Sequence, residues 1–309
     1  MLWLFKRAGG ASSQIGVFVT AEGVAAAQLS KTGAKPRLER CVYERKGDSK
    51  GDSDPVARVL ARLPNRRAPA VSVLDPGGYR LLLVEAPDVP ADELRAAVRW
   101  RIKDLIDFHI DDAVIDVFEM PPHARGGRNR MMYAVTAKAD FVKQQIDLIE
   151  SAGLNLDVID IGELSLRNVA TLFEAEQRGT AFLYLGERQS TLLLVRQGVL
   201  YLARHVETGV ATLAEAGELR PELVGGLALE VRRSLDYFES HYEQTSIPQL
   251  HTCGLEAADR DQLARELGTA VRDVDLKNLL EMDDALSPEL QRLCLPAIGA
   301  ALRKDPVAL

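Results

Sequence analysis

The sequence is poor in the residues that build disulfide frameworks and metal centres. Among its 309 residues are three cysteines, Cys41, Cys253 and Cys294, which are far apart and form no CxxC pair. This pattern excludes a disulfide framework and a cysteine-based zinc site. The five histidines form no HExxH motif and no cluster with cysteine, so no metal site is expected. We expect the three thiols to be reduced and to lie in or near the core.

Positive charge and long apolar runs are also scarce. The chain has 38 Lys and Arg against 45 Asp and Glu, and this net charge of -7 disfavours broad attraction to nucleic acid or anionic lipid. The local basic stretch 123–130 is predicted to be a solvated hairpin loop. No apolar run reaches the roughly 18 residues of a membrane-spanning helix, and residues 1–8 are too short for the apolar region of a signal peptide. The sequence therefore predicts a cytoplasmic protein without a transmembrane segment or a nucleic-acid partner.

The motifs of common catalytic sites are missing as well. The sequence contains no GxSxG nucleophile elbow, no Walker A loop and no GxGxxG dinucleotide motif, so no catalytic residue is expected. What remains is typical of a folded protein, with 47% hydrophobic and 27% charged residues and no long low-complexity tract. The length exceeds that of a usual single domain, which predicts two lobes of about 150 residues.

Alternating hydrophobicity predicts that the first half opens on a β-hairpin. Residues 14–20 and 23–30 alternate as two strands joined by a tight turn. Farther along, a β-α-β-β-α-β unit is predicted over about 79–155. Its first helix, over 89–106, has acids in the first turn and apolar residues at helical spacing. The first half is thus α/β, with a subdomain inserted after its opening strands.

The second half repeats this opening. Strand patterning restarts at Thr180, and residues 181–205 are typical of strands joined by a glycine-containing turn. Apolar residues at spacings of 3 and 4 then predict a helix of about five turns over 224–242. A terminal helix follows, which Pro296 is able to kink.

The lobe boundary is expected where strand patterning restarts. A helix over 164–177 separates the two halves. We therefore place the first lobe at 1–178, including the inserted subdomain at about 79–155, and the second lobe at 179–309.

Two lobes that each open on such a hairpin, with a later strand ending in glycine and a closing helix, resemble the actin-like (ribonuclease H-like) ATPase architecture. Within it, the sequence resembles the PilM family of type IV pilus biogenesis and its relative MshI of the mannose-sensitive haemagglutinin (MSHA) pilus. The resemblance covers nearly the whole chain, and its most specific segments are "VPADELRAAVRWRIKDLIDFHIDDAVIDV" and "LALEVRRSLDYFES". It implies a two-lobed α/β fold whose C-terminal helix returns to the first lobe.

The resemblance also implies an ATP site, from which this sequence departs. In ATP-binding members, an Asp in the first phosphate loop helps to hold the metal, and glycines let backbone N–H groups approach the phosphate. Here Phe18 stands at the Asp position, Thr20 at the second glycine position and Tyr184 at the Asp position of the second loop. Glu22 and Glu187 are the acids left at these turns that could substitute. The glycines that remain from the three nucleotide motifs are Gly16, Gly186 and Gly254.

Phosphoryl transfer depends on positioning and on neutralisation of the phosphate charge. With both metal-side carboxylates replaced, we expect a remnant nucleotide cleft that does not hydrolyse ATP. No cofactor is expected, and ATP binding is disfavoured.

The resemblance implies a partner as well. PilM-family proteins dock the short cytoplasmic N-terminus of a PilN-like inner-membrane protein and connect the pilus assembly platform to its motor. The expected function is therefore that of a non-enzymatic scaffold at the cytoplasmic face of the inner membrane, associated with the membrane through its partners.

Three residues of the helix over 89–106 are expected to bind the partner peptide: Arg95, Arg99 and Trp100. They lie off the inward apolar stripe of this helix, and two guanidinium groups one turn apart can grip a peptide carboxylate or carbonyl. In the alternative, both arginines pair with acids of the same helix and Trp100 packs into the lobe.

Three other functions stay open at this point. One is an ATP-binding switch of the same fold that retains nucleotide through backbone contacts. Another is a type II secretion component resembling GspL, a class that usually continues into a transmembrane helix. The third is an actin-like small-molecule kinase, which would need the phosphate-loop carboxylates.

Overall fold

The computed structural model describes residues 13–31, 33, 35–47, 54–121, 130–173, 178–242 and 246–304. The chain divides into two compact units. The first unit is Met1–Ser165 with Pro296–Leu309, and the second unit is Leu166–Leu295. Residues 1–8 and most of the basic stretch 123–130 lie outside the described residues.

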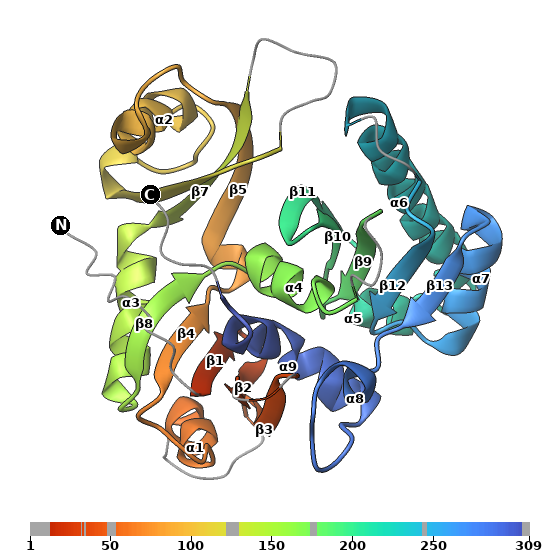
Figure 1. Ribbon diagram of the computed structural model, residues 1–309, viewed down its shortest axis with the longest axis horizontal. Coiled ribbons are helices and arrows are strands. Elements are labelled where there is room, and N and C mark those ends of the chain that lie inside the picture. Colours follow the sequence, from red (N-terminus) through yellow and green to blue (C-terminus); the bar gives the residue numbers. More distant parts are fainter. Residues whose placement is uncertain are drawn as a thin grey trace. The chain divides into compact units, whose positions relative to one another are not determined.

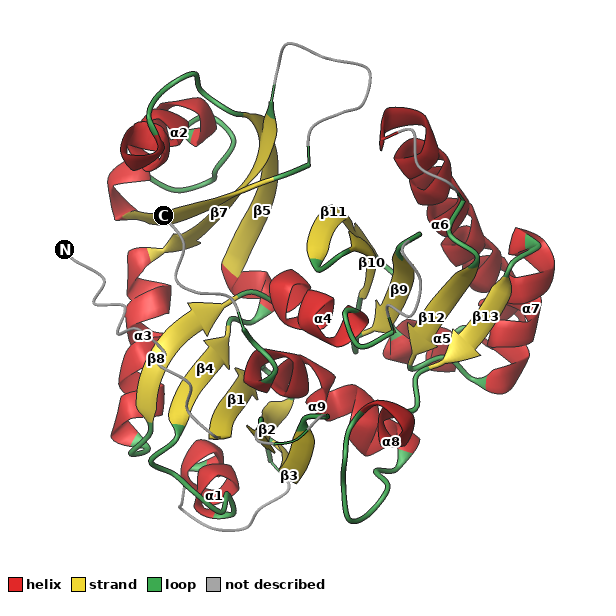
Figure 2. Ribbon diagram, viewed as in Figure 1, coloured by secondary structure: helices red, strands yellow, loops and turns green. Residues whose placement is uncertain are grey.

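The first unit is built on a five-stranded sheet in the order β3-β2-β1-β4-β8 (Figures 1 and 2). Its strands are β1 (Ser13–Val19), β2 (Gly23–Ser30), β3 (Arg37–Arg45), β4 (Pro69–Val73) and β8 (Asn155–Asp160). Strands β1, β2 and β3 are antiparallel neighbours, whereas β4 and β8 run parallel to β1. The predicted opening hairpin is confirmed.

Alternation along β1 sends its side chains into two different layers. Its odd-numbered residues pack in one cluster with α1 (Pro55–Ala61): Ile15, Val17 and Val19. On the other face, Phe18 packs with Ala300 of helix α9 (Pro288–Ala301). Gly16 lies on this second face too, so α9 passes over a strand position that has no side chain. Both faces of the sheet are therefore covered within the first unit.

Between β4 and β8 the chain forms a smaller sheet in the order β5-β7-β6. Its strands, β5 (Tyr79–Glu85), β6 (Ala113–Glu119) and β7 (Met131–Lys138), are antiparallel. Helix α2 (Leu94–Ile102) packs on one face and α3 (Ala139–Ser151) on the other. The predicted β-α-β-β-α-β order is confirmed, and its last strand, β8, pairs with β4 of the larger sheet.

The second unit is built on a sheet in the order β11-β10-β9-β12-β13. Its strands are β9 (Thr180–Leu185), β10 (Ser190–Arg196), β11 (Val199–Val206), β12 (Gln249–Cys253) and β13 (Ala270–Asp273). Strands β9 to β11 are antiparallel, whereas β12 and β13 run parallel to β9. Strand order and directions are those of the larger sheet in the first unit, so the chain repeats one topology.

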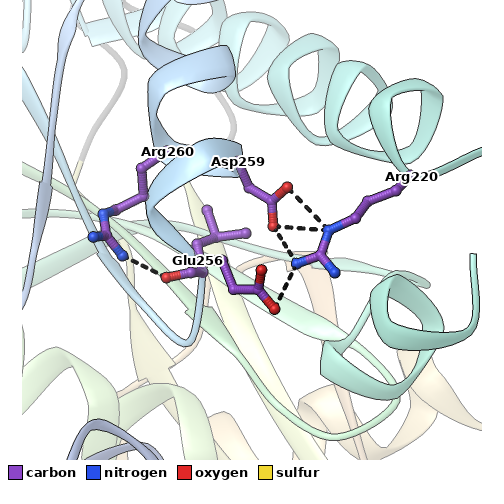
Figure 3. A network of polar contacts seen from close by, with 5 residues as sticks. Arg220, Glu256, Asp259 and Arg260 are labelled. Carbon is purple, nitrogen blue, oxygen red and sulfur yellow. Dashed lines mark hydrogen bonds and ion pairs between the residues drawn. The ribbon is translucent and has the colours of Figure 1, made fainter. Parts of the chain in front are cut away.

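Two helices of the second unit, α6 (Arg220–Tyr242) and α7 (Ala257–Leu267), are joined by a polar network (Figure 3). Arg220 Nη2 donates to the buried Asp259 carboxylate at 2.8 Å and lies 2.9 Å from Glu256 Oε1. Arg260 of α7 donates to the Leu255 carbonyl. The Arg220 guanidinium donates to the Asp259 carboxylate from two of its nitrogens, Nε and Nη2. This pair therefore fixes the start of α6 against α7.

The observed bounds of two helices differ from the predicted ones, and one short strand is not predicted. The helix predicted over 89–106 is α2, from Leu94 to Ile102, preceded by a 3₁₀ turn at Ala91–Glu93. The helix predicted over 164–177 is α4 (Gly162–Ala170). The division between the units passes through α4 and again through α9. Strand β13 is absent from the prediction because it has only four residues, three of them exposed.

None of the three cysteines forms a disulfide, and they lie in or near the core as expected, with Cys253 and Cys294 buried and Cys41 half-buried. In the described ranges, no helix is both long enough and apolar enough to cross a membrane. Those ranges also hold no group of three or more His, Cys, Asp or Glu that could bind a metal ion.

Candidate functional site

The turn between β1 and β2 is closed by its own hydrogen bonds. The Thr20 N–H donates to the Gly23 carbonyl at 2.9 Å. The N–H groups of Glu22 and Gly23 donate to the Thr20 hydroxyl at 3.2 and 3.3 Å. A phosphate-binding turn aims such N–H groups at its ligand. Here the side chain at the expected glycine position accepts two of them.

Gly16, expected as a remnant of the same loop, has a packing role. A Cβ at this position would lie 1.8 Å from the Ala297 carbonyl oxygen and 2.8 Å from the Ala301 nitrogen, both in α9. Phe18, at the expected Asp position, packs half-buried against side chains of β4, β8 and α9. Contacts within the first unit therefore account for both residues.

Two buried acids at and just after the end of β8, Asp160 and Glu163, are missed by the sequence analysis. The carboxyl ends of parallel strands are where α/β sheets bind ligands. Arg303 Nη1 donates to Asp160 Oδ2 at 2.6 Å, and the Tyr79 hydroxyl donates to Glu163 Oε2 at 2.6 Å. Burial, together with this carboxylate, raises the pKa of Tyr79 well above its usual range. The motif "DIGE" after an apolar strand is the signal that could have found them.

In the second unit, Tyr184 is the residue at the expected Asp position of the second loop. Its buried hydroxyl donates to the Arg292 carbonyl at 3.2 Å, and burial raises the pKa of this phenol above its usual range. Nη2 of Arg292 lies 3.3 Å from Oε2 of Glu187, in the turn after β9. The acid that could substitute for the missing Asp is thus paired with an arginine of the same unit.

The two glycines expected as remnants in the second unit have structural roles as well. The Gly186 N–H donates to the Gln189 carbonyl at 2.9 Å and closes the turn between β9 and β10. Gly254 has a φ of +102°, and a Cβ there would lie 2.8 Å from Arg292 Cδ and 3.0 Å from Leu185 Cβ. A Cβ at Gly186 would lie 2.9 Å from the Gln189 carbonyl oxygen, so close packing accounts for this glycine, and conformation with packing accounts for Gly254, without a ligand at either position.

The two arginines expected to grip a peptide are paired with acids of neighbouring segments. Arg95 Nη2 lies 3.0 Å from Asp116 Oδ1 in β6, and Arg99 Nη2 lies 2.5 Å from Asp111 Oδ1 in the 3₁₀ turn before β6. These acids lie outside α2, whereas the sequence alternative placed the partners within the helix. Such partly exposed pairs contribute about 1 kcal/mol or less each.

Trp100 lies on the solvent side of α2. Its side chain is 72% exposed, so the expected alternative, in which it packs into the lobe, is wrong. Lys103 Nζ lies 5.9 Å from the centre of its ring, a contact that contributes about 0.5–1 kcal/mol at an exposed site. Among the three residues expected to bind a partner, Trp100 offers the most open apolar surface.

Comparisons with known proteins find similarity in structure. Neither a scan against protein-family models nor a search of curated protein sequences gives a match. Among solved structures, the chain is similar to a chain of a PilM-PilN type IV pilus biogenesis complex, with a TM-score of 0.71 and 21% identity, covering 95% of this chain and 98% of that chain. It is also similar to the cytoplasmic domain of EpsL, an inner membrane component of the type II secretion system of Vibrio cholerae, with a TM-score of 0.53 and 11% identity, covering 96% and 97% of the two chains. A third similar structure is the ethanolamine utilization protein EutJ from Carboxydothermus hydrogenoformans, with a TM-score of 0.52 and 11% identity, covering 94% and 90%.

The chain has the actin-like fold. Its two sheets of identical strand order are the repeated core of that fold, and the sheet β5-β7-β6 is the inserted subdomain. The turns after β1 and β9 are the ones that the sequence resemblance marks as phosphate loops. In this actin-like chain, both turns are closed by hydrogen bonds between their own residues.

Proposed function

We propose that this chain is a scaffold of a type IV pilus or MSHA-like assembly machine at the cytoplasmic face of the inner membrane. It docks the cytoplasmic N-terminus of a PilN-like inner-membrane protein and so connects the assembly platform to its motor. The observation that carries this proposal is the similarity to a chain of the PilM-PilN complex over 95% of this chain and 98% of that one. Coverage of that extent includes the inserted subdomain as well as the repeated core that actin-like proteins share.

The proposed scaffold acts without nucleotide. In the first unit, the Thr20 hydroxyl accepts the N–H groups that a phosphate would need, and Phe18 replaces the metal-side acid. In the second unit, Tyr184 replaces the other acid and Arg292 pairs with Glu187. Since phosphoryl transfer needs a metal-held phosphate, these contacts support a fold that no longer binds or hydrolyses ATP.

Mg-ATP is expected to leave the thermal unfolding midpoint of the purified chain unchanged at 1 mM, with no hydrolysis above background. A site with a dissociation constant of about 10 μM would stabilise the native state by about 2.7 kcal/mol at that concentration. Differential scanning fluorimetry with and without Mg-ATP measures this. Phe18→Asp alone is expected to restore nothing, because Thr20 still closes the turn. A rise of several degrees in the parent chain would support the ATP-binding switch instead.

A type II secretion component resembling GspL is the second candidate. The similarity to the EpsL cytoplasmic domain, over 96% of this chain and 97% of that one, favours it. Both candidates make the chain a cytoplasmic partner of an inner-membrane protein, and they differ in which membrane protein recruits it.

Recruitment to membranes by the PilN-like protein tests the proposed function. Co-produced with a full-length PilN-like protein from the same genome, the chain is expected to sediment with the membrane fraction. With a partner that lacks its cytoplasmic N-terminal segment, the chain is expected to stay in the supernatant. The matched control is co-production with the corresponding type II secretion membrane protein. Recruitment by that control alone would favour the second candidate, and recruitment by neither would contradict both.

A further inference from the structure

The first unit contains a half-buried lysine, Lys31, directly after strand β2. Its Nζ donates to the side-chain carbonyl of Gln14 in β1 and, at 2.5 Å, to the backbone carbonyl of Arg303 after α9. Among the described residues both acceptors are uncharged, and no acid pairs with this amine. The two contacts match the two N–H groups of a neutral amine, whereas an ammonium group has three donors to satisfy.

The charged groups beside Lys31 come from the segment after α9, and they disfavour the ammonium form. Lys304 carries a like charge, and the Arg303 side chain donates to Asp160 of β8 at 2.6 Å, so this acid is already paired. Burial, together with the charge of Lys304, lowers the pKa of Lys31 to about 8. At pH 7.5 about a quarter of such an amine is neutral, against about 0.1% for a lysine with the usual pKa.

A neutral amine held in this way is a nucleophile. Lysines are activated by removal from water or by a neighbouring cation, and both conditions hold at Lys31. Its N–H groups are directed at the carbonyls of Gln14 and Arg303, which leaves the nitrogen lone pair to react. Lys31 is only half-buried and Lys304 is exposed, so a small reagent can approach from solvent.

We propose that Lys31 is a modification site that accepts an acyl group from an acyl phosphate, with Lys304 attracting the phosphate. The lone pair of Nζ forms a bond to the acyl carbon, and the bond from that carbon to the phosphate oxygen breaks. Phosphate leaves with the electron pair, and the proton lost by the nitrogen passes to solvent. The products are an amide and inorganic phosphate, without oxidation or reduction. An anionic donor suits the site because the charge of Lys304 raises its local concentration.

Acylation would change how the end of α9 is attached to the sheet. An amide nitrogen carries one N–H, so the acylated side chain cannot donate to both Gln14 and Arg303. Arg303 is held by its carbonyl through Lys31 and by its side chain through Asp160. Loss of the first contact leaves the second, so the modified chain is expected to stay folded with lower stability. This role is independent of the proposed scaffold function.

The test is incubation of the full chain with acetyl phosphate at pH 7.5, with acetylation of each lysine followed over time by peptide mass spectrometry. Lys31 is expected to react about tenfold faster than a lysine with the usual pKa, because its larger neutral fraction outweighs the lower nucleophilicity of a less basic amine. Two internal references are the exposed Lys143 of α3 and Lys46, whose Nζ donates to one carbonyl, that of Thr20. The rate at Lys31 is expected to level off above about pH 8, the pKa of this amine.

Changes at Lys304 separate the effect of its charge from that of burial. Lys304→Met removes the cation, so acetylation of Lys31 at pH 7.5 is expected to fall about threefold and its plateau to move to higher pH. Lys304→Arg keeps the charge and is expected to react as the parent does. Lys277→Met, at an exposed lysine of the second unit, makes the same change of charge elsewhere and is expected to have no effect. With an uncharged donor, the N-hydroxysuccinimide ester of acetate, the preference for Lys31 is expected to persist but to be smaller.

Acetylation of Lys31 no faster than that of Lys143 and Lys46, or a rate that Lys304→Met leaves unchanged, would overturn the inference. An equal preference for Lys31 with both donors would contradict the attraction of phosphate by Lys304. The structural consequence is measured by the urea unfolding midpoint before and after acetylation, in the parent and in Lys31→Arg. A larger fall in the parent is expected, since the other lysines react in both chains. Equal falls would show that the contact of Lys31 with Arg303 does not hold the end of α9.

Discussion

Replacing Gly16 with alanine is expected to lower the free energy of unfolding by about 3 kcal/mol or more. The added methyl group would lie 1.8 Å from the Ala297 carbonyl oxygen and 2.8 Å from the Ala301 nitrogen. Both are backbone atoms of α9, so relief requires a shift of the helix instead of a rotamer change. Overpacking of a well-packed core costs about 1–3 kcal/mol and occasionally more. The contact with α9 puts Gly16 at the upper end of that range.

Urea unfolding monitored by circular dichroism measures this loss, and Gly226→Ala is the matched control. Gly226 lies within α6, and a Cβ there would have no atom within 4 Å. The same change should therefore stabilise the chain by about 0.5–1 kcal/mol, as alanine does when it replaces glycine in a helix. If Gly16→Ala and the parent are equally stable, α9 does not pack closely against β1 at Gly16. The result also separates two roles for Gly16, because a packing role predicts the loss in the absence of any nucleotide.

Periodic elements of the fold are predictable from the sequence because burial imposes a repeat on them. The strands of both opening hairpins and the inward stripe of α2 follow from alternation and from helical spacing. The buried face of α6 is predictable from helical spacing too, and Val224, Phe238 and Tyr242 are buried as predicted. Strand β13 is not predictable in this way, since its sequence AVRD is short and mostly exposed.

Residue roles at the candidate site are harder to predict, because they depend on contacts between segments far apart in sequence. The sequence marks Gly16 as a remnant of a phosphate loop, but α9, which lies above it, comes some 280 residues later. Likewise, helical spacing suggests partners for Arg95 and Arg99 within the same helix, whereas the observed partners are Asp116 of β6 and Asp111 of the 3₁₀ turn before it. A short motif shows which residue type stands at a position. The neighbours that fix its role come from the tertiary fold.

The sequence also does not predict that the two five-stranded sheets share one strand order. Only the opening hairpins of the two units look alike, yet β4 and β12 take equivalent places beside β1 and β9. Backbone pairing in a sheet does not depend on side-chain identity, so equivalent strands can share a place without sharing residues. The actin-like core therefore becomes visible in the order and direction of strands.

Arg303→Met is expected to lower the free energy of unfolding by about 3–5 kcal/mol. The Asp160 side chain is 2% exposed, and Arg303 Nη1 donates to it at 2.6 Å. Removing one partner of a buried pair leaves an uncompensated charge, which costs that amount. The double variant Arg303→Met with Asp160→Asn should recover most of the loss. Arg233→Met is the matched control for an exposed pair, since Arg233 is 60% exposed in its contact with Glu230 and should cost less than about 1 kcal/mol.

Adding Mg²⁺ to the Arg303→Met variant tests whether Asp160 is a cation ligand or only the structural partner of Arg303. Asp160 is buried at the carboxyl end of a parallel strand, the edge of such sheets where ligands bind, in the same unit as Phe18, which stands at the expected Asp position. If Asp160 were a latent cation ligand masked by Arg303, millimolar Mg²⁺ would stabilise the variant by occupying the vacated side. We expect no such gain, because Asp160 also accepts the Ile161 N–H at 2.9 Å, and the described part of the chain holds no group of three or more His, Cys, Asp or Glu that could bind a metal ion around it. A Mg²⁺-dependent rise in the urea midpoint of Arg303→Met, absent from the double variant, would assign Asp160 to a cation site and reopen nucleotide binding in the first unit.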